Sequence, residues 1–354
     1  MCEVEIGIDS FSFCYPLTSK QKSQIIENLK SLPKFQTRCS NYFEKTYDYT
    51  SDYFAKRGVK LRIFKKKGSI WNLFITIHPI LLMGVAHRGA LYAPNNKSIM
   101  YILLGNADKI LTEIDCPCKL REIKLYRVDV TANLIFEDSD IVDNYLRILK
   151  KSLLLPHYHE DWFHKGDGKA KDYKLANKHS YKQSCKAAAF FAYDKTAQLE
   201  MIDALPFSLI DKKVLRLEVQ LRRKGMKKWV KKDHMDDCIE TLIKLSKKTN
   251  DIICWYLKRT QLKDSDYIQY KEAAQQIAKL KSKKTRERML YLLRKTSDQH
   301  TLSNAQKSLQ DKFNLRSNQT NRILKKFSDL GISPITLTNA DTMERLPALS
   351  NFLK

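Results

Sequence analysis

The spacing of apolar residues changes once along the chain, and this change constrains the fold more than any other feature. Up to about residue 222, several short segments alternate apolar and polar residues. Such alternation is typical of strands that bury one face. After Arg223 the apolar residues recur with helical spacing as far as about Leu330. We therefore expect an α+β fold, with a mainly antiparallel sheet in residues 1–235 and an all-α region in residues 236–354.

The individual elements follow from the same spacing and from turn-forming and helix-capping residues. Strands are expected at residues 4–13, 60–64, 71–78, 125–134, 187–195 and 214–222. Helices are expected at residues 96–111 and 139–154, and Ser139 or Asp140 is the expected N-cap of the second helix. A hairpin turn is expected at residues 65–69, between two of the strands.

The composition is strongly basic and points to a phosphate-rich partner. The 354 residues include 64 Lys and Arg against 39 Asp and Glu, a formal net charge of +25. Basic surfaces attract nucleic acid or anionic membranes. The longest apolar run, residues 73–86, contains His78, Pro79 and Gly84 and is shorter than the roughly 20 residues of a spanning helix. The N-terminus has no signal-peptide pattern. We therefore expect a cytoplasmic, nucleic-acid-binding protein with reduced cysteines.

Polar side chains share one face of the expected strands, because alternate residues of a strand point the same way. If the strands are neighbours, this face gathers Asp129, Tyr193, Lys195, Arg216, Glu218 and His78. Two carboxylates and an imidazole are suitable ligands for Mg²⁺ or Mn²⁺. A tyrosine beside such a metal can attack a phosphodiester, while Lys195 and Arg216 stabilise the phosphate charge.

The same pattern also fits a face that only forms ion pairs. Antiparallel sheets often have one solvated face, on which Arg pairs with Asp or Glu across strands. A lone tyrosine in a strand is more often a packing residue than a nucleophile, and His78 before Pro79 is more often structural than a ligand. The residues alone therefore leave both interpretations open.

Four short motifs follow one another in a recognisable order. They are Ile77-His78-Pro79 with the stretch to Tyr92, Arg127-Val128-Asp129, Ala192-Tyr193-Asp194-Lys195, and Leu215-Arg216-Leu217-Glu218, which basic residues and Trp229 follow. In order and spacing they resemble the filamentous-phage gene II/X replication initiators and the related rolling-circle plasmid Rep proteins. The resemblance covers roughly residues 1–335.

The resemblance implies a nicking domain that cuts one strand of a double-stranded origin. The family's tyrosine becomes joined to the 5′ phosphate, and the free 3′ hydroxyl primes replication before the enzyme closes the displaced strand. Tyr193 matches this nucleophile, and Asp129 and Glu218 match the family's acidic positions. The wider superfamily has a His-hydrophobic-His metal motif, of which the corresponding strand here keeps only His78. The ligand set therefore departs from the family pattern.

Other expectations complete this interpretation. The implied cofactor is Mg²⁺ or Mn²⁺, and the implied partners are single- and double-stranded origin DNA, a host helicase and a second copy of the chain, in the cytoplasm of a bacterial host. The three histidines His157, His159 and His164 follow a helix and Pro156, so we expect them in a loop, as DNA contacts before ligands. Tyr173 and Tyr181 are candidates for a second catalytic tyrosine, and nothing ranks them.

Two further segments are expected to bind DNA. Residues 212–232 contain ten Lys or Arg and the single acidic residue Glu218, and Trp229 lies among them. From this segment we expect Arg222, Arg223, Lys227, Lys228 and Trp229 to contact phosphates. Residues 304–330 have the pattern of a helix-turn-helix, with Ser317 capping the second helix and Gly331 ending it. Asn318, Gln319, Arg322 and Lys325 are expected to face a DNA groove.

Two rival functions stay open at this point. A non-catalytic, sequence-specific DNA-binding protein, such as a repressor or a degenerate Rep, fits the missing second histidine but not the complete set of Tyr193, Asp129 and Glu218. An RNA-binding factor fits less well, because the chain lacks the glycine and aromatic pattern of common RNA modules.

Overall fold

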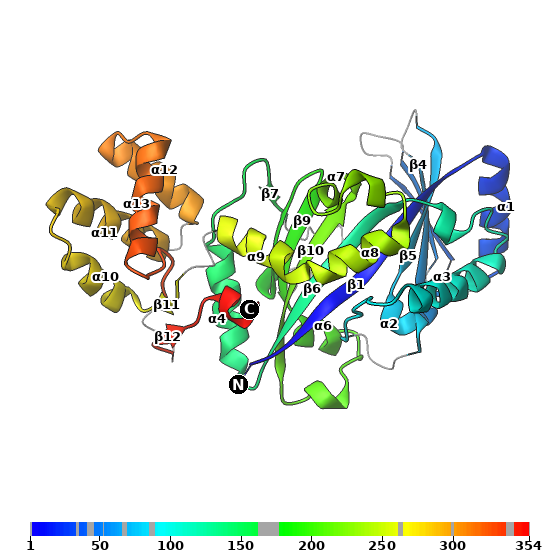
Figure 1. Cartoon of the computed structure of the whole chain (residues 1–354), viewed down its shortest axis with the longest axis horizontal. Coiled ribbons are helices and arrows are strands. Elements are labelled where there is room, and N and C mark those ends of the chain that lie inside the picture. Colours follow the sequence, from blue (N-terminus) through cyan, green and yellow to red (C-terminus); the bar gives the residue numbers. More distant parts are fainter. Residues whose placement is uncertain are drawn as a thin grey trace.

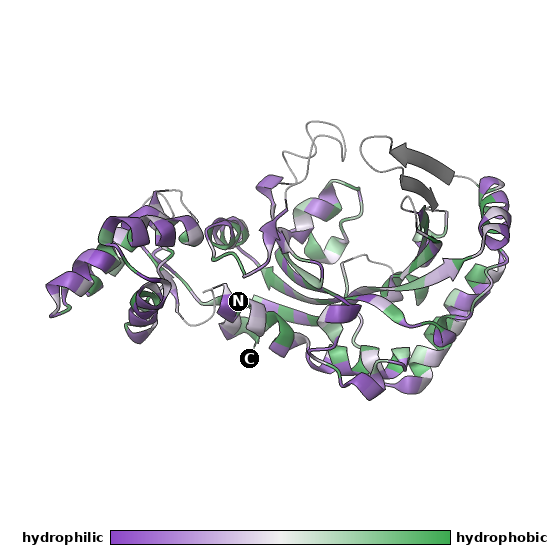
Figure 2. Ribbon diagram, turned by 90° about the horizontal axis from the view of Figure 1, so that it is seen from above, coloured by the Kyte–Doolittle hydropathy of each residue, from purple (hydrophilic) through white to green (hydrophobic). Residues whose placement is uncertain are grey.

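A computed structural model describes residues 2–32, 35–40, 46–51, 53–65, 69–84, 89–161, 177–260, 265–298, 301–337 and 343–353. In these ranges the chain forms one large antiparallel sheet, helices that cover its convex side, and a helical group at the C-terminal end (Figures 1 and 2). The chain is therefore an α+β protein, as expected. No helix in the described ranges is both long and apolar enough to cross a membrane.

The large sheet has ten described strands, in the order β2-β3-β4-β5-β1-β6-β10-β9-β8-β7. The first five strands of the chain are β1 (Cys2–Leu17), β2 (Phe35–Ser40), β3 (Thr46–Ser51), β4 (Val59–Lys65) and β5 (Trp71–Ile77). The other five are β6 (Leu125–Phe136), β7 (His159–Glu160), β8 (Ser180–Ser184), β9 (Ala188–Asp194) and β10 (Lys213–Arg222). All described pairings between them are antiparallel.

The strand expectations are largely confirmed, including the neighbourhood on which the polar-face argument depends. The segments 125–134, 214–222 and 187–195 lie side by side as β6, β10 and β9. The last of these ends one residue early, because the Asp194 side chain accepts a hydrogen bond from the backbone N–H of Ala197 and caps a helix. The turn expected at residues 65–69 falls largely outside the described residues.

Strand β1 contains a bulge that changes which side chains face the cavity of the sheet. Its register against β6 pairs Ile8 with Val130 and then Ser10 with Asp129, so Asp9 is the extra residue. A bulge turns two successive residues toward the same side. Both Asp9 and Ser10 consequently point to the concave face.

The convex face of the sheet carries the hydrophobic core. The fully buried side chains Val128, Val130, Leu217 and Val219 lie on it, as their alternation predicts. Two helices, α8 (Cys238–Lys247) and α9 (Thr249–Arg259), pack on β6, and α9 also contacts β10 and β1. These helices come after residue 235, so the packing around the sheet extends past the boundary expected there.

The remaining helices connect or flank the strands. They are α1 (Ser19–Lys30), α2 (Pro79–Leu82), α3 (Lys97–Thr112), α4 (Ser139–Lys150), α6 (Lys195–Glu200) and α7 (Arg223–Met226). Asn96 caps α3. Helix α4 ends four residues earlier than expected, and its N-cap is Asp138, whose side chain accepts a hydrogen bond from the N–H of Asp140. The caps expected at Ser139 or Asp140 are therefore wrong by one or two positions.

The C-terminal group stands apart from the sheet at the left of Figure 1. It contains α10 (Tyr270–Ala278), α11 (Lys283–Ser297), α12 (Leu302–Phe313) and α13 (Ser317–Asp329), with the short strands β11 (Tyr267–Ile268) and β12 (Arg345–Leu346). Helices α12 and α13 form the expected helix-turn-helix. Asn314 takes a left-handed conformation at the turn, and Gly331 takes another after α13. The N-cap of α13 is Arg316 and not Ser317, since the Arg316 N–H donates to Gln319.

Candidate active site

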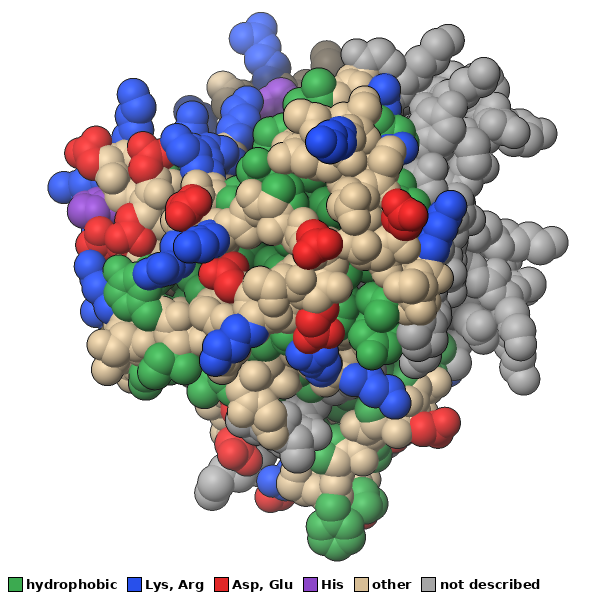
Figure 3. Space-filling model, turned by 90° about the vertical axis from the view of Figure 1, so that its right-hand side faces the viewer, with side chains coloured by type: hydrophobic (Ala, Val, Ile, Leu, Met, Phe, Trp, Pro, Cys, Tyr) green, Lys and Arg blue, Asp and Glu red, His purple; other side chains and the backbone are tan. Residues whose placement is uncertain are grey.

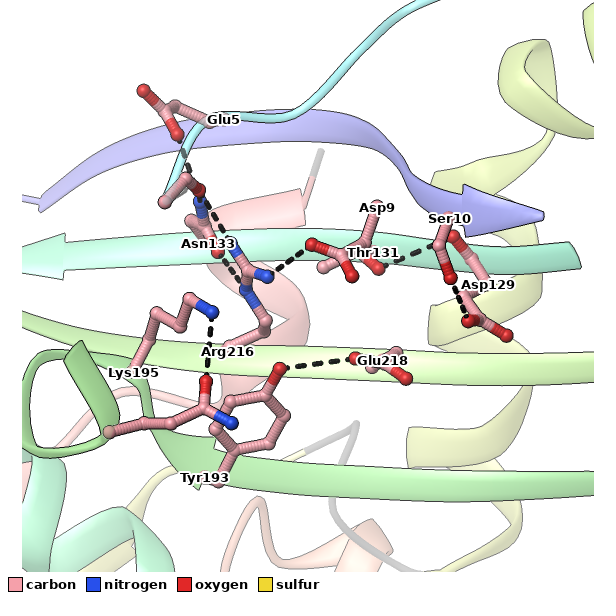
Figure 4. Close-up of polar contacts among 12 residues, drawn as sticks. Glu5, Asp9, Ser10, Asp129, Thr131, Asn133, Tyr193, Lys195, Arg216 and Glu218 are labelled. Carbon is pink, nitrogen blue, oxygen red and sulfur yellow. Dashed lines mark hydrogen bonds and ion pairs between the residues drawn. The ribbon is translucent and has the colours of Figure 1, made fainter. Parts of the chain in front are cut away.

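A cavity of about 610 Å³ lies on the concave face of the sheet, where β5, β1, β6, β10 and β9 meet. It brings together four of the six side chains that the sequence predicted as catalytic or metal-binding, which are Tyr193, Asp129, Glu218 and His78. The first three lie on the directly neighbouring strands β9, β6 and β10, whereas His78 follows β5, on the other side of β1. Figure 4 shows the contacts of the first three. The polar-face argument therefore grouped four side chains that line one cavity.

Tyr193 is hydrogen-bonded to a carboxylate in this cavity. Its hydroxyl donates to Oε2 of Glu218 at 3.1 Å, from β9 to the adjacent strand β10 (Figure 4). Burial and the negative charge of Glu218 raise the pKa of Tyr193 well above its usual value, and the positive charge of Arg216 acts against this. The phenol is therefore protonated at neutral pH, and its proton points at a group that can accept it.

Asp129 has one satisfied and one unsatisfied carboxylate oxygen. Its Oδ2 accepts a hydrogen bond from Ser10 at 2.6 Å and pairs with Nη2 of Arg127 at 3.0 Å. Its Oδ1 is buried and has no hydrogen-bond partner in the described part of the chain. Burial raises the pKa of Asp129 to about 7, and the charges of Glu218 and Asp9 add to this increase. An unpaired, buried oxygen of this kind is costly without a ligand.

His78 precedes α2 and lines the same cavity. Burial lowers the pKa of its imidazole to about 4, although the negative charge of Asp9 opposes the change. The ring is consequently neutral at pH 7, and a neutral imidazole has a free lone pair for a proton or a metal ion. A ligand role for His78 stays a prediction.

Arg216 and Lys195 do not line the cavity, which differs from the expected phosphate contacts. Arg216 is fully buried, and its guanidinium pairs with Asp9 at 2.5 Å and donates to Oδ1 of Asn133 at 2.8 Å and to the backbone carbonyl of Gly89. Its donors are thus committed to the protein. Its guanidinium contacts the cavity residue Asp9 without lining the cavity itself.

Lys195 lies outside strand β9, so its side chain does not share a face with Tyr193, and the prediction that it does is wrong. It is the first residue of α6, is 8% exposed, and donates to Oε1 of Gln198 at 2.8 Å (Figure 4). The strand ends at Asp194, so the alternation that predicted a shared face stops one residue too early. Its side chain lines a separate, small cavity of about 100 Å³.

Asp9 and Ser10 are cavity residues that the strand alternation missed. Burial raises the pKa of Asp9, while the charges of Arg216, Lys195 and His78 lower it, and the net direction is downward. The sequence does carry a signal for them. Along β1 the polar residues stand at odd positions up to Asp9 and at even positions from Ser10, and this change of parity marks the bulge.

The donors of the cavity fit a divalent cation in part. The unpaired Oδ1 of Asp129, the carboxylate of Glu218 and the neutral ring of His78 are hard donors of the right kind. No group of three His, Cys, Asp or Glu side chains stands close enough to hold a metal, as far as the described ranges show. Mg²⁺ commonly binds through one or two carboxylates, with water and substrate phosphate completing the shell. Asp129 and Glu218 are the residues that would supply them.

Positive charge is unevenly distributed around the molecule. At the end formed by α1 and α3, basic and acidic side chains are mixed with apolar ones (Figure 3). The cavity lining holds the cations Lys60, Arg127 and Lys182 together with four acidic side chains. Arg127 pairs with Asp129 and Lys182 pairs with Asp161, each at 3.0 Å. Lys60 is exposed and forms no described ion pair. The wall therefore offers charges that attract a phosphate near Tyr193.

The basic segment after β10 lies away from this cavity. Arg222 donates to the backbone carbonyl of Cys185, and Arg223 pairs with Asp236 at 3.6 Å. Lys228 stacks 3.0 Å above the ring of Trp255, and Trp229 packs edge-on against that ring. Trp255 belongs to α9, on the convex side of the sheet. Of the five expected phosphate contacts, only Lys227 is exposed without a described partner.

His179 also lines the cavity, and the sequence analysis did not single it out. The other histidines and tyrosines that the sequence singled out do not line it where they are described. His159 in β7 pairs with Asp161 at 3.0 Å, and His157 sits in the preceding loop with a positive φ of 66°. Tyr181 is buried and hydrogen-bonded to Ser152 at 2.9 Å, so it is not placed for catalysis. Tyr173, His87 and His164 lie outside the described residues.

Helix α13 exposes the four side chains that were expected to face DNA. Asn318, Gln319, Arg322 and Lys325 are all exposed, while Ile323, Leu324 and Phe327 pack inward. The side chain of Gln319 differs from expectation, because its Oε1 accepts the N–H of Arg316 at 2.9 Å and so caps its own helix. Asn318, Arg322 and Lys325 remain available to a ligand.

The comparisons with known proteins leave the site to be interpreted from its own chemistry. Residue types, burial and hydrogen bonds at the cavity point to a nucleophile with a proton acceptor, beside cations that suit a phosphate. No protein-family model matches the chain, and no curated protein matches it.

Proposed function

We propose that the chain is a rolling-circle replication initiator that nicks and rejoins one strand of a double-stranded origin. The observation that carries the proposal is the hydrogen bond from Tyr193 to Glu218 inside a cavity whose lining also includes Lys60, Arg127 and Lys182. A phenol poised on a carboxylate, next to charges that attract phosphate, suits phosphoryl transfer through a covalent intermediate. The motif order described from the sequence supports the same conclusion.

The proposed reaction uses the residues of the cavity in two steps. Tyr193 attacks the phosphorus, Glu218 accepts the phenolic proton, and the bond from phosphorus to the 3′ oxygen breaks. The 3′ oxygen takes a proton from solvent, and the 5′ phosphate stays on Tyr193. In joining, a 3′ hydroxyl gives its proton to solvent as its oxygen attacks the phosphorus, the bond from phosphorus to the tyrosine oxygen breaks, and Glu218 returns its proton to Tyr193.

Cations in and near the cavity complete the proposal. Arg127, Lys60 and Lys182 offset the charge of the transferring phosphate from the wall. A Mg²⁺ or Mn²⁺ ion, when bound at Asp129 and Glu218, supplies polarisation of a phosphoryl oxygen. Asp129 then needs its ionised form, which its pKa of about 7 makes dependent on pH near neutrality.

The C-terminal helices give this proposal a second DNA contact. Asn318, Arg322 and Lys325 on α13 would read base edges in the major groove of the origin, while the sheet acts on one strand. Origin binding and strand cutting would then belong to different ends of the chain. A host helicase and a second copy of the chain are the further partners that this function implies.

The test incubates the full chain with supercoiled DNA that carries its own replicon, with Mg²⁺ or Mn²⁺. We expect open circles and a covalent protein–DNA adduct, both lost in Tyr193→Phe. Tyr101→Phe is the matched control, because Tyr101 is 47% exposed on α3, far from the cavity. Nicking by Tyr193→Phe at the parental rate would assign the attack to another group and refute the proposed mechanism.

A second candidate function is sequence-specific DNA binding without catalysis, as in a repressor. The observation that favours it is the exposed polar face of α13, together with the lack of a three-ligand metal group in the described ranges. It predicts origin binding by the full chain with no open circles in either metal. The same incubation therefore separates the two functions.

A further inference from the structure

The concave face of the sheet continues past the cavity as a row of aromatic and basic side chains. Thr76 on β5 lines the cavity, and Phe74 lies two residues further along the same strand. Residues two apart share a face and are roughly 7 Å apart along the strand. Phe74 therefore lies just beyond the cavity on the same side of the sheet.

Phe74 contacts an exposed aromatic side chain from strand β6. The ring of Tyr126, on β6, meets the ring of Phe74 edge-on with centroids 5.1 Å apart. Tyr126 is 39% exposed, and the register of β6 against β1 shifts at this point. The following residue, Arg127, lines the cavity. The two rings thus form a platform next to the cavity wall.

Strand β4 adds charge and a third ring. Its register places Lys60 opposite Thr76, Arg62 opposite Phe74 and Phe64 opposite Asn72. Directly paired residues share a face, so all three lie on the concave side. The Arg62 guanidinium lies 4.9 Å from the centroid of the Phe64 ring.

These aromatic side chains are not part of the core. Phe64, Phe74 and Tyr126 are absent from the buried cluster on the convex side and from the partly buried side chains that pack on it. A surface of partly exposed rings among cations is unusual for a sheet that only needs solvation.

We propose that this row, formed by Lys60, Arg62, Phe64, Phe74 and Tyr126, is a binding track for single-stranded DNA that leads into the cavity. Proteins that hold single strands combine a cationic groove with rings on which bases stack. The row has both components and joins the cavity through Lys60, Thr76 and Arg127. The choice of DNA over RNA rests on the proposed nicking function.

The first test measures binding of a fluorescein-labelled dT20 oligonucleotide by fluorescence anisotropy, with the full chain in EDTA so that no strand is cut. The variant Phe74→Leu/Tyr126→Leu keeps apolar volume but removes both rings. We expect it to bind roughly 5- to 100-fold more weakly, as for the loss of a stacked base. Phe207→Leu is the control, since Phe207 is 90% exposed but begins a short 3-10 helix, Phe207–Leu209, after α6.

The second test addresses the charge of the track. Lys60→Gln should lower the slope of log K against log [salt] by about 0.7, the value for one phosphate contact on a single strand. Lys109→Gln is the matched control, because Lys109 is exposed on α3. An unchanged slope in Lys60→Gln would remove Lys60 from the track.

Each outcome distinguishes the track from the proposed function. If the double leucine variant melts at the parental temperature and binds dT20 with the parental affinity, the track is refuted. This holds even if Tyr193-dependent nicking persists. If that variant does not fold, Phe64→Leu repeats the test, because the described contact of its ring is with Arg62. An rU20 oligonucleotide bound tenfold more tightly than dT20 would overturn the assignment to DNA. If the parent does not nick DNA but its binding of dT20 depends on the two rings, the proposed nicking activity is refuted and the binding track stands.

Discussion

The cavity of the sheet and helix α13 present polar side chains in opposite ways. At the cavity, Asp129 and Glu218 are buried, and the half-buried Asp9 pairs with the buried Arg216, which does not line the cavity. Burial and the charge of Glu218 raise the pKa of Asp129, and burial and the charge of Asp9 raise the pKa of Glu218. On α13, Asn318, Arg322 and Lys325 are exposed, and their contacts are mainly with solvent. Buried groups in one network respond together to substitution, whereas exposed, separate groups respond one by one.

The strongest test of the network is the removal of the proton acceptor. Glu218→Gln keeps the shape of the side chain and an oxygen that accepts the Tyr193 hydroxyl, but it removes the carboxylate. We expect nicking to fall about 10²- to 10⁴-fold, the usual contribution of a general base. Initial rates of open-circle formation measure this. Glu272→Gln, on the exposed face of α10, should nick like the parent.

The nicking rate of Glu218→Gln also shows whether Glu218 acts as a base or only as a structural partner of Tyr193. If Glu218→Gln nicks at the parental rate, the hydrogen bond to Tyr193 is structural and the cavity is not a catalytic network. Equal loss in Glu218→Gln and Glu272→Gln would point to a general defect of the preparations and contradict a local role.

The second test breaks the buried ion pair below the site. Arg216→Met leaves Asp9, Asn133 and the Gly89 carbonyl without their donor. We expect the free energy of unfolding to fall by about 3–5 kcal/mol, as for one partner of a buried pair. Urea denaturation followed by circular dichroism measures it. The same substitution on α13, Arg322→Met, should change stability by less than about 0.5 kcal/mol; similar losses in both would erase the contrast.

The third test measures how stability depends on pH, and the direction of this dependence follows from the raised pKa of Asp129. The folded protein raises its pKa from an ordinary value near 4 to about 7, so the folded state binds more protons than the unfolded state between these values. The contribution of Asp129 to stability is therefore present at pH 4 and lost as the pH rises through about 7. Asp129→Asn removes this titration.

We expect Asp129→Asn to melt at a higher temperature relative to the parent at pH 8 than at pH 5. Nicking by the parent should increase over the same range, as Asp129 ionises. Differential scanning fluorimetry from pH 5 to 8, in buffers of constant ionic strength, measures the first effect. A difference in melting temperature that does not change with pH would show that Asp129 titrates normally.

The sequence predicted the residues at the centre of the concave site more accurately than the residues around them. Alternation in β6, β9 and β10 placed Asp129, Tyr193 and Glu218 correctly, because period-two patterns report the face of a strand directly. It failed at Lys195, where the Asp194 cap ends the strand, and at Asp9, which lies in a bulge. Both errors come from local interruptions of the period: a side-chain cap to Ala197 at the end of β9, and a bulge that depends on the pairing of β1 with β6.

Burial was the property that the sequence reported least well. Arg216 has the residue type of a phosphate contact, yet tertiary packing closes it off and pairs it with Asp9, more than two hundred residues away in the chain. Helices α8 and α9 show helical periodicity like those that follow them, and their packing on the sheet is likewise a long-range contact. Periodicity defines elements, and it does not define which partner each element buries.

The smallest expected effect belongs to α13, where each side chain acts alone. Arg322→Ala should weaken binding to the origin duplex by about 1–3 kcal/mol and relax the sequence preference at one position, if it contacts a base edge. Lys307→Ala removes an exposed charge from α12 and is the matched control. Anisotropy with origin and scrambled duplexes measures both. In the double variant Arg322→Ala/Lys325→Ala, the loss of binding free energy should equal the sum of the two single losses. A loss that exceeds this sum by more than about 0.5 kcal/mol would show that α13, like the cavity, is a coupled network.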